Sequence, residues 1–419
     1  MSRARVRRRL PPPLLHRDYR LLWIAVVCIG FAIQMQIVAV GWQVYEIDRN
    51  PLHLGLVGLA EFLPLPLLAL PAGQLADRVS RKAIFLGSIV VDAAVAAGLL
   101  LVAATDTGHL WPYLALAATT GVASAVGSPA ARSLPPALVP QELLASAMAL
   151  RSTGVQGAVI VGPAVGGLLF AVRPELTYAV SAVLLAVGLL CVLGLRERGI
   201  VQQVAVAEPP PRLEAILAGV RFIRRSPVLL GAISLDLFAV LFGGAVALLP
   251  LFARDILHTG PVGLGVLRSA PAVGAILAGI ILTRRPLRRR VGRTLLVVVA
   301  VFGVSMLVFG LSRSFPLSLA ALAVGGFADM ISVNIRATIV PLATPDEVLG
   351  RVNAVEMVFI SASNELGAFE SGVAAALIGA VPAVVVGAAA TIAIAVFWTR
   401  FFPALARIDR FEDLRPVPV

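Results

Sequence analysis

Ionisable side chains interrupt the long apolar stretches of this chain. They comprise seven acids and two bases: Glu61, Asp92, Asp236, Asp329, Glu356, Glu365, Glu370, Arg151 and Arg268. A charge at the centre of a membrane helix costs about 2.5 to 3.5 kcal/mol on insertion scales, so these groups must face protein or water. Together they suit a polar cavity that carries a proton or a charged solute. The alternative for any one of them is a structural pair, or a place at the membrane interface.

Asp236 and Glu365 are the strongest candidates for exchanging a proton or binding a cationic solute, because each lies well inside an apolar segment. A carboxyl group that loses its hydration in such a place can be neutral near pH 7. An acid that faces Arg268 or Arg151 would instead stay charged and act structurally. Neutral Asn or Gln at a proton-exchanging position is expected to abolish gradient-driven transport while folding and solute binding survive.

Polar residues on the eleventh apolar segment fall on two helical faces. One face holds Ser361, Asn364 and Glu365, and the other holds Glu356, Ser363 and Glu370. One of these faces is expected to line the cavity. Asp92 and Glu370 are the weaker candidates for coupling.

Composition excludes a water-soluble domain, since 59% of the 419 residues are hydrophobic and only 14% are charged. The net charge of +12 is spread over short clusters between apolar segments, which indicates topology and not a nucleic-acid surface. Cys28 and Cys191 lie within apolar segments, and the four histidines lie near segment ends. We therefore expect no catalytic centre, no metal site and no cofactor.

Length and hydropathy predict an all-α integral membrane protein with twelve transmembrane helices. The expected spans are roughly 21–44, 54–73, 83–104, 110–132, 142–170, 176–195, 228–252, 261–283, 293–312, 316–338, 347–378 and 381–400. With the N-terminus inside, 29 of the 35 Lys and Arg residues fall on the cytoplasmic side. Both termini are therefore expected in the cytoplasm.

The spans divide into two related halves. The predicted organisation is a basic cytoplasmic arm (1–20), a six-helix bundle (21–195), a cytoplasmic linker (196–227), a second six-helix bundle (228–400) and a cytoplasmic tail (401–419). Arg132 before Pro140 is echoed by Arg336 before Pro345, at an offset of about 205 residues. Within the linker, Leu213–Arg225 has the spacing of an amphipathic interfacial helix. Parallel repeats of this kind place a substrate site near the bilayer midplane.

A charged loop, GQLADRVSRK, connects the second and third spans. Taken alone it could be a plain topology determinant. Its pattern resembles the loop motif of the major facilitator superfamily of secondary transporters, with Ser80 where that family usually has Gly. We expect Asp77 to lie against the start of the eleventh helix, where Thr344 has capping-box spacing to Glu347. The expected cytoplasmic gate comprises Gly73, Asp77, Arg78, Arg81, Lys82, Glu347 and Arg351.

The fifth span contains GPAVGG, from Gly162 to Gly167, with Pro163 and Gly166 between them. Small residues allow close approach of two helices, and the proline bends its helix. The sequence resembles the superfamily's antiporter motif, found in exporters. A packing role without bearing on transport direction is the alternative.

The resemblance extends over essentially the whole chain and implies that the first, fourth, seventh and tenth helices line the pathway. It would place Gln34, Gln36, Ser124, Ser128, Asp236, Asp329 and Asn334 near that pathway. The arginine that drug/proton antiporters often carry in mid-helix four is missing here, since Arg132 lies at the helix end.

The linker, TPDEVLGRVNAV and GPAVGG together resemble the branch that contains enterobactin-type siderophore exporters and related drug and macrolide efflux proteins. The expected function is proton-coupled export of a small amphipathic molecule across the bacterial inner membrane by alternating access, with the proton gradient as energy source. A lysophospholipid or fatty-acid translocator of the same fold is one alternative, and a non-transporting membrane scaffold or sensor is another. The expected partners are a small-molecule substrate and the lipid bilayer, with the chain acting as a monomer.

Overall fold

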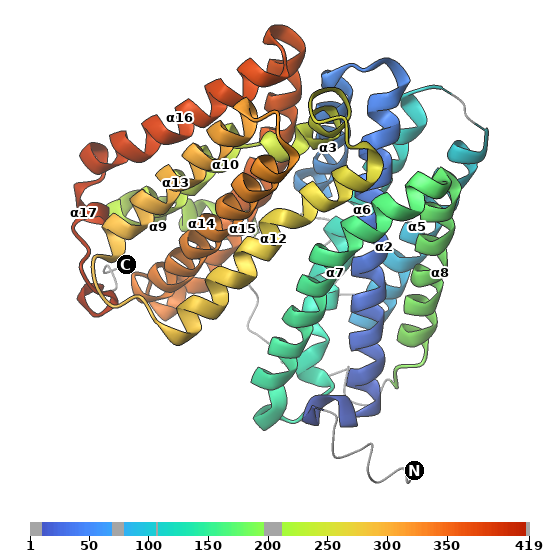
Figure 1. Ribbon diagram of the computed structural model, residues 1–419. Helices are drawn as coiled ribbons and strands as arrows, with labels where there is room; N and C mark the ends of the chain where they lie inside the picture. Colours follow the sequence, from blue (N-terminus) through green and yellow to red (C-terminus); the bar gives the residue numbers. More distant parts are fainter. Residues whose placement is uncertain (1–10, 69–78, 106–107, 197–211, 416–419) are drawn as a thin grey trace. The chain divides into compact units, whose positions relative to one another are not determined.

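The structure, a computed structural model, describes residues 11–68, 79–105, 108–196 and 212–415 (Figure 1). Helices dominate, and the described residues contain no strand. The prediction of an all-α membrane protein is confirmed.

Among the described residues, six membrane-span helices precede the linker and six follow it. The first set is α2 (Arg17–Asp48), α3 (Pro51–Phe62), α5 (Arg81–Thr105), α6 (Trp111–Ser133), α7 (Leu144–Val172) and α8 (Pro174–Leu193). The second set is α10 (Pro227–Phe242), α12 (Gly260–Arg284), α13 (Val291–Leu311), α14 (Phe315–Leu342), α15 (Asp346–Ile378) and α16 (Ala380–Phe401). Short elements fill the connections: η1 (Pro12–Leu15), η2 (Pro135–Ala137), η3 (Gln141–Leu143), α9 (Arg212–Arg225), α17 (Pro403–Ala406) and η6 (Phe411–Asp413).

Eleven of the described helical segments are long and apolar enough to cross a membrane. The twelfth span, α15, is 33 residues long. It falls outside that set because six charged residues lie along it: Asp346, Glu347, Arg351, Glu356, Glu365 and Glu370. Its polarity marks it as a helix that must face protein or water along part of its length.

The seventh span is broken, whereas the sequence predicted one continuous helix over 228–252. α10 ends at Phe242, and Gly243 and Gly244 separate it from η4 (Ala245–Leu248), α11 (Leu249–Leu251) and the π-helical turn η5 (Phe252–Ile256). Two adjacent glycines have low helix propensity, and the amide of Ala245 donates to the Gly243 carbonyl instead of one four residues back. The break lies near the middle of the span.

The chain separates into two compact units. Unit 1 comprises Met1–Ile47, Ala60–Val206 and Gly260–Gly265, and unit 2 comprises Asp48–Leu59, Ala207–Thr259 and Val266–Val419. In unit 1, α5 packs along both α6 and α8, and in unit 2, α13 packs along both α14 and α16. The third span therefore contacts the fourth and sixth just as the ninth contacts the tenth and twelfth, as two related six-helix halves require.

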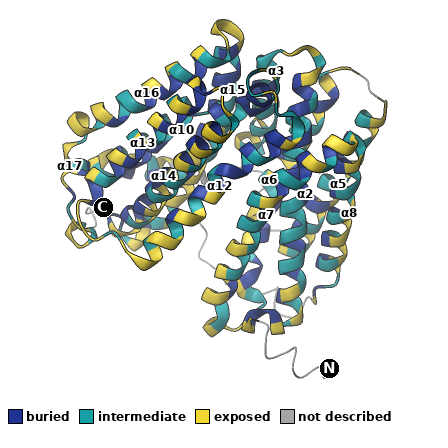
Figure 2. Ribbon diagram, viewed as in Figure 1, coloured by how far each residue is buried: buried dark blue, intermediate teal, exposed yellow. Residues whose placement is uncertain are grey.

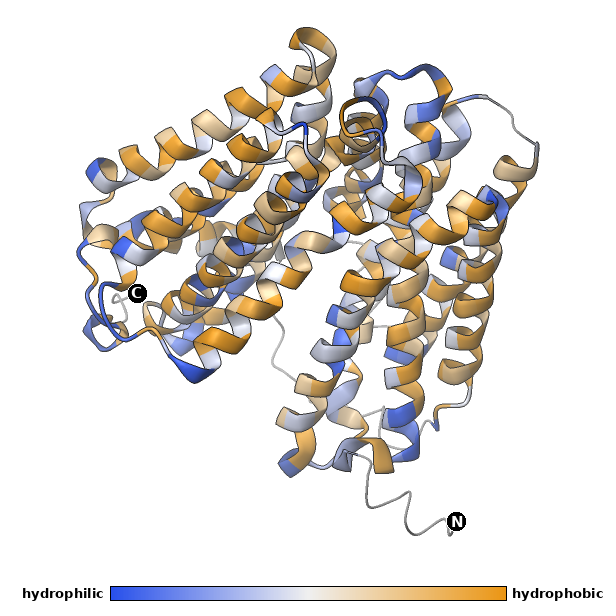
Figure 3. Cartoon of the chain, viewed as in Figure 1, coloured by the Kyte–Doolittle hydropathy of each residue, from blue (hydrophilic) through white to orange (hydrophobic). Residues whose placement is uncertain are grey.

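In each unit the buried residues line the inward helix faces, and the outward faces are exposed (Figure 2). Those outward faces are mostly hydrophobic (Figure 3). Leu377 is 78% exposed, Phe401 70% and Leu190 68%. A soluble monomer rarely presents so much apolar surface to water, so lipid must cover it.

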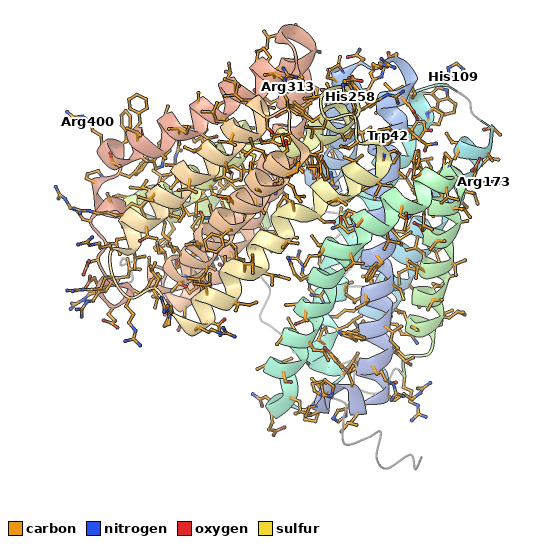
Figure 4. All side chains as sticks on the ribbon, in the orientation of Figure 1. Trp42, His109, Arg173, His258, Arg313 and Arg400 are labelled. Atoms are coloured by element: carbon orange, nitrogen blue, oxygen red, sulfur yellow. The ribbon has the colours of Figure 1, made fainter. Side chains whose placement is uncertain are left out.

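The labelled polar residues in Figure 4 lie at helix ends or in the connections between helices. In unit 2, His258 and Arg313 lie at one end of the bundle and Arg400 at the other end of α16. In unit 1, His109 and Arg173 share one end. This alternation is what consecutive membrane crossings produce.

The linker helix α9 packs against α15 and α10 in unit 2. Phe222 and Ile223 are buried in the core of that unit, whereas Arg221, Arg224 and Arg225 are exposed. A β-carbon on Gly219 would lie 2.8 Å from the Arg351 carbonyl oxygen. The expected interfacial helix therefore uses part of its apolar face for protein packing.

The segment after α16 caps the start of α13. The amides of Val291 and Gly292 donate to the carbonyl oxygens of Asp409 (3.2 Å) and Ile408 (3.0 Å). The carboxylate of Asp409 accepts from the Arg290 amide (3.1 Å) and lies 3.6 Å from Arg289 Nε. Helix amides that have no intrahelical partner are thus satisfied by the C-terminal segment.

Gly292→Ala is expected to lower stability by about 1 to 3 kcal/mol, because a β-carbon there would lie 1.8 Å from the Leu405 carbonyl oxygen. Thermal unfolding of the purified protein in detergent measures the effect. Gly279→Ala is the matched control, since the nearest atom to its β-carbon is Met330 Cε at 3.9 Å. Equal melting temperatures for the two variants would contradict this cap.

Candidate functional site

A cavity of about 420 Å³ lies within unit 2. It is enclosed by the broken seventh span and by α12, α13, α14 and α15, several of which pack directly on one another (Figure 1). Its walls are Val240, Gly243, Gly244, Val246, Ala247, Arg268, Pro271, Phe302, Met306, Leu322, Gly326, Asp329, Asn364, Glu365 and Ala368.

Four polar side chains predicted from sequence meet in this cavity: Arg268, Asp329, Asn364 and Glu365. Asp329 lies near the middle of α14, about 20 Å from either end at 1.5 Å per residue. Asn364 donates from Nδ2 to the Ile360 carbonyl oxygen at 2.9 Å, which leaves its Oδ1 available toward the cavity. The structure thus brings side chains from three helices to one water-accessible space.

Glycines at the break in the seventh span make room for this cavity. Gly243 and Gly244 line it, and a β-carbon on Gly244 would lie 2.7 Å from the Gly367 carbonyl oxygen and 2.8 Å from Ser371 Oγ. Only glycine allows α15 to approach the break so closely. Discontinuous helices of this kind expose backbone polar groups at transporter binding sites.

Asp236 lies outside the cavity lining and is paired instead. Its Oδ1 lies 2.6 Å from Nη2 of Arg336, and the two side chains are only 9% and 5% exposed. Arg336 also donates from Nε to Ser332 Oγ at 3.4 Å. This buried ion pair joins α10 to α14.

Sequence analysis missed Arg336 as a partner, because its position near the end of the tenth span suggested a cytoplasmic residue. It is 4% exposed and sits inside α14. Its seven-residue spacing from Asp329 places both on one face of the helix. Sequence reasoning could have found Arg336 by asking which arginine pairs with Asp236, because a carboxylate buried in an apolar span needs a cation.

The remaining pathway candidate on α14 points elsewhere. Asn334 is exposed, its carbonyl oxygen accepts from Thr338 Oγ1 at 2.9 Å, and it does not line the cavity. Glu356 and Glu370 on α15 are half-buried and also lie outside the lining.

Candidates in unit 1 are distributed over several helices. Gln34, Gln36, Glu61, Asp92 and Arg151 are all half-buried. Gln34 packs beside Gly162, and the Glu61 carbonyl oxygen lies 2.1 Å from where a β-carbon on Gly121 would be. Arg151 Nε is buried without a hydrogen bond among the described residues.

On α6, Ser124 and Ser128 are exposed, with their hydroxyl oxygens 3.5 Å apart. They lie one helical turn apart on a single face of α6. That face is the one on which the family resemblance placed a pathway.

The gate motif is described only in part. Gly73, Asp77 and Arg78 lie outside the described residues, and so does the expected contact of Asp77 with the start of α15. Lys82 Nζ donates to the carbonyl oxygens of Leu195 (2.7 Å) and Leu193 (3.3 Å), and Arg81 donates to that of Ser133 (3.4 Å). These contacts tie the start of α5 to the ends of α8 and α6.

The capping box expected at Thr344 is wrong. α15 begins at Asp346 with Pro345 as its N-cap and has no side-chain cap, while the Thr344 hydroxyl is buried without a hydrogen bond among the described residues. Proline has the extended backbone that an N-cap needs (ψ 148°), which shifts the helix start. Glu347 is exposed and Arg351 half-buried in the first turns.

The GPAVGG segment of α7 forms close helix contacts in unit 1. β-Carbons on Gly162 and Gly166 would lie 2.7 Å from Gln34 Cβ and from Met35 Cα of α2. A β-carbon on Gly167 would collide with the Pro261 carbonyl oxygen, and Pro163 itself is buried. The segment therefore forms a closely packed contact between α7 and its neighbouring helices.

Gly166→Ala is expected to destabilise the protein by about 1 to 3 kcal/mol, because its β-carbon would meet the Met35 backbone. Gly157→Ala on the same helix is the control, since nothing lies within 4 Å of that β-carbon. Thermal unfolding in detergent compares them. A Gly166→Ala protein as stable as the control would contradict the packing described.

No group of three or more His, Cys, Asp or Glu side chains able to hold a metal ion occurs among the described residues. The cavity's chemistry is that of reversible binding, with charged, amide and apolar groups but no activated nucleophile. It can hold a small solute with both polar and apolar parts.

The family model described as "Transmembrane secretion effector" matches residues 11–414. An enterobactin exporter, EntS, of Citrobacter koseri is 26% identical over 407 residues, covering 94% of this chain and 92% of that protein. The enterobactin exporter EntS of Escherichia coli O1:K1 / APEC is 28% identical over 340 residues, covering 79% of this chain and 77% of that protein.

Solved structures share the fold at low identity. The nucleoside transporter NupG (D323A mutant) gives a TM-score of 0.73 at 13% identity, covering 92% of this chain and all of that one. A bacterial homologue of the human lysosomal transporter Spinster gives 0.71 at 15% identity, covering 98% and 100%.

Proposed function

This chain belongs to the transmembrane secretion effector family of the major facilitator superfamily, and we propose that it exports a small amphipathic molecule in exchange for protons. It is a secondary transporter and a multi-pass membrane protein. The observation that carries the proposal is the cavity of about 420 Å³ in unit 2, which Arg268, Asp329, Asn364 and Glu365 line together with apolar residues.

The proposed setting is the bacterial inner membrane, with both termini in the cytoplasm. Its support is the excess of Lys and Arg in segments on that side. The chain acts as a monomer, needs no cofactor and takes its energy from the proton gradient. The relatives named as enterobactin exporters support export and a solute of the siderophore, drug or macrolide class.

Glu365 is the proposed proton carrier. Glu365 lines the cavity, so a proton can reach its carboxylate from water. Loss of hydration disfavours the charged form of a carboxyl group, which makes uptake of a proton possible there. In each cycle the carboxylate takes up a proton from the outer side as solute leaves. It then releases that proton to the cytoplasm when the cavity faces inward, which prepares the site for the next solute.

Asp236 and Arg336 take a different role in this scheme. Their ion pair is already closed at 2.6 Å and shielded from the cavity, so Asp236 stays charged and holds α10 against α14. The proposal therefore gives different roles to the two acids that the sequence ranked together.

Transport by inside-out membrane vesicles that carry the protein tests the function. Vesicles acidified inside are expected to accumulate at least one member of a panel of catecholate siderophores, macrolides, cationic dyes and lysophospholipids, and a protonophore should abolish accumulation. Accumulation of lysophospholipid alone would favour the lipid translocator. Failure to move any panel member, with folded protein present, would leave a non-transporting scaffold or sensor as the better account.

A further inference from the structure

The lining of the cavity in unit 2 combines apolar and charged side chains. Phe302 and Met306 of α13, Leu322 of α14 and Val240 of α10 are apolar, and the charged and amide groups come from α12, α14 and α15. Ligand pockets of about 300 to 1,000 Å³ hold drug-sized molecules, and this cavity lies within that range. An apolar body with one polar end would match both kinds of lining residue.

The charges of the lining do not balance. Two carboxylates, Asp329 and Glu365, face one guanidinium, that of Arg268. The nearby Arg336 cannot supply a second positive charge, because Asp236 holds it at 2.6 Å. With both acids ionised, the cavity carries one net negative charge.

Asp329 is the acid best placed to meet a ligand. It is open to the cavity at the centre of α14, and the charged residues that act on it electrostatically, Asp236 and Arg336, are already paired with each other. A carboxylate in a partly apolar space is stabilised strongly by an opposite charge, since effective dielectric values there are well below that of water. A solute ammonium group would supply that charge.

We propose that this cavity binds a lipophilic cation, with a protonated amine or iminium at Asp329 and the apolar body against Phe302, Met306 and Leu322. The Phe302 ring in the lining suits such a ligand further, because cations are attracted to ring faces. The inference names the substrate class of the transporter proposed above and rests on that function. It also distinguishes this chain from carriers of anionic catecholates, whose charge the lining would repel.

Two dyes with the same xanthene ring system provide the probe. Rhodamine 123 is a cation and fluorescein is an anion at pH 7.5, so their comparison isolates charge from shape. Fluorescence polarisation with the purified full-length protein in uncharged detergent is expected to show at least about tenfold tighter binding of rhodamine 123. Equal binding of both dyes, or tighter binding of fluorescein, would overturn the proposal.

Variants then locate the cation. Asp329→Asn should weaken rhodamine 123 binding by about tenfold or more, whereas Asp329→Glu should restore much of it. Glu370→Gln on α15, outside the lining, is the control and should bind like the original protein. If Asp329→Asn misfolds, the wild-type comparison of the two dyes still decides. Unchanged binding by a folded Asp329→Asn protein would refute the role of Asp329.

The binding experiment and the vesicle assay can contradict their two proposals independently of each other. Asp329-dependent binding of the cation without accumulation in vesicles would refute export and leave the binding site standing. Proton-driven accumulation of siderophores or lysolipids without cation binding would support export and refute the substrate class.

Discussion

Asp236→Asn is expected to destabilise the protein by about 3 to 5 kcal/mol, the usual effect of removing one partner from a buried ion pair. The loss follows from Arg336, which would keep its charge at 5% side-chain exposure while its hydrogen bond to Ser332 Oγ replaces none of the lost carboxylate. The apparent melting temperature in detergent should fall by roughly 10 °C. Intrinsic tryptophan fluorescence during heating measures it.

Two control variants distinguish the effect of breaking this ion pair from the effect of removing any carboxylate. Glu142→Gln removes an exposed carboxylate and should leave the melting temperature unchanged. The double variant Asp236→Leu, Arg336→Met should recover most of the stability, since apolar replacements of a buried pair are often neutral or favourable. A single Asp236→Asn variant as stable as Glu142→Gln would show that the ion pair contributes nothing to folding.

This result differs from what the sequence predicted for Asp236. Sequence analysis expected neutralisation to spare folding, because a neutral amide resembles the protonated acid of a proton-exchanging site. The partner comes from α14, a hundred residues later, and its identity depends on how α10 and α14 pack. The sequence analysis held that an acid facing an arginine acts structurally. Because Asp236 faces Arg336, that criterion gives Asp236 a structural role.

The fold was predictable from the sequence, because the length of the apolar segments determines how often the chain crosses the membrane. The family was predictable too, and its model matches residues 11–414. The expectation of a transporter and not an enzyme is confirmed by the family and its relatives. Boundaries failed where backbone detail decides them, as at the Gly243–Gly244 break and the Pro345 cap. Hydropathy averages over such breaks, because the flanking residues remain apolar.

Helical phase located part of the site. Asn364 and Glu365 were placed on one face of the eleventh span, and both line the cavity, whereas Asn334 on the tenth span does not. Spacing along one helix predicts which residues share a face. It does not say which face meets which neighbour, and the convergence of Arg268 with Asp329 across α12 and α14 is set by tertiary packing.

Glu365→Gln is expected to abolish accumulation driven by a pH gradient while solute binding persists. Glutamine has nearly the shape of the protonated acid but cannot release a proton, so the cycle stops after one binding event. Because Gln retains hydrogen-bonding capacity but lacks the negative charge of the ionised acid, the Kd for solute should rise by less than about tenfold, equivalent to under about 1.4 kcal/mol. Solute exchange without a gradient, which needs no net proton movement, should continue at a measurable rate.

Glu370→Gln supplies the matched comparison, since it neutralises another half-buried acid five residues later on α15 that does not line the cavity. Its vesicles should accumulate solute as the original protein does. Inside-out vesicles with an imposed pH gradient, assayed beside exchange at equal pH, distinguish coupling from binding. Full gradient-driven accumulation by Glu365→Gln would exclude Glu365 as the carrier, and Asp329, the other cavity acid, would then be the group to test. Loss of both exchange and binding would instead show that the Glu365 charge maintains the cavity, because only a structural or ligand-binding role removes exchange that requires no proton.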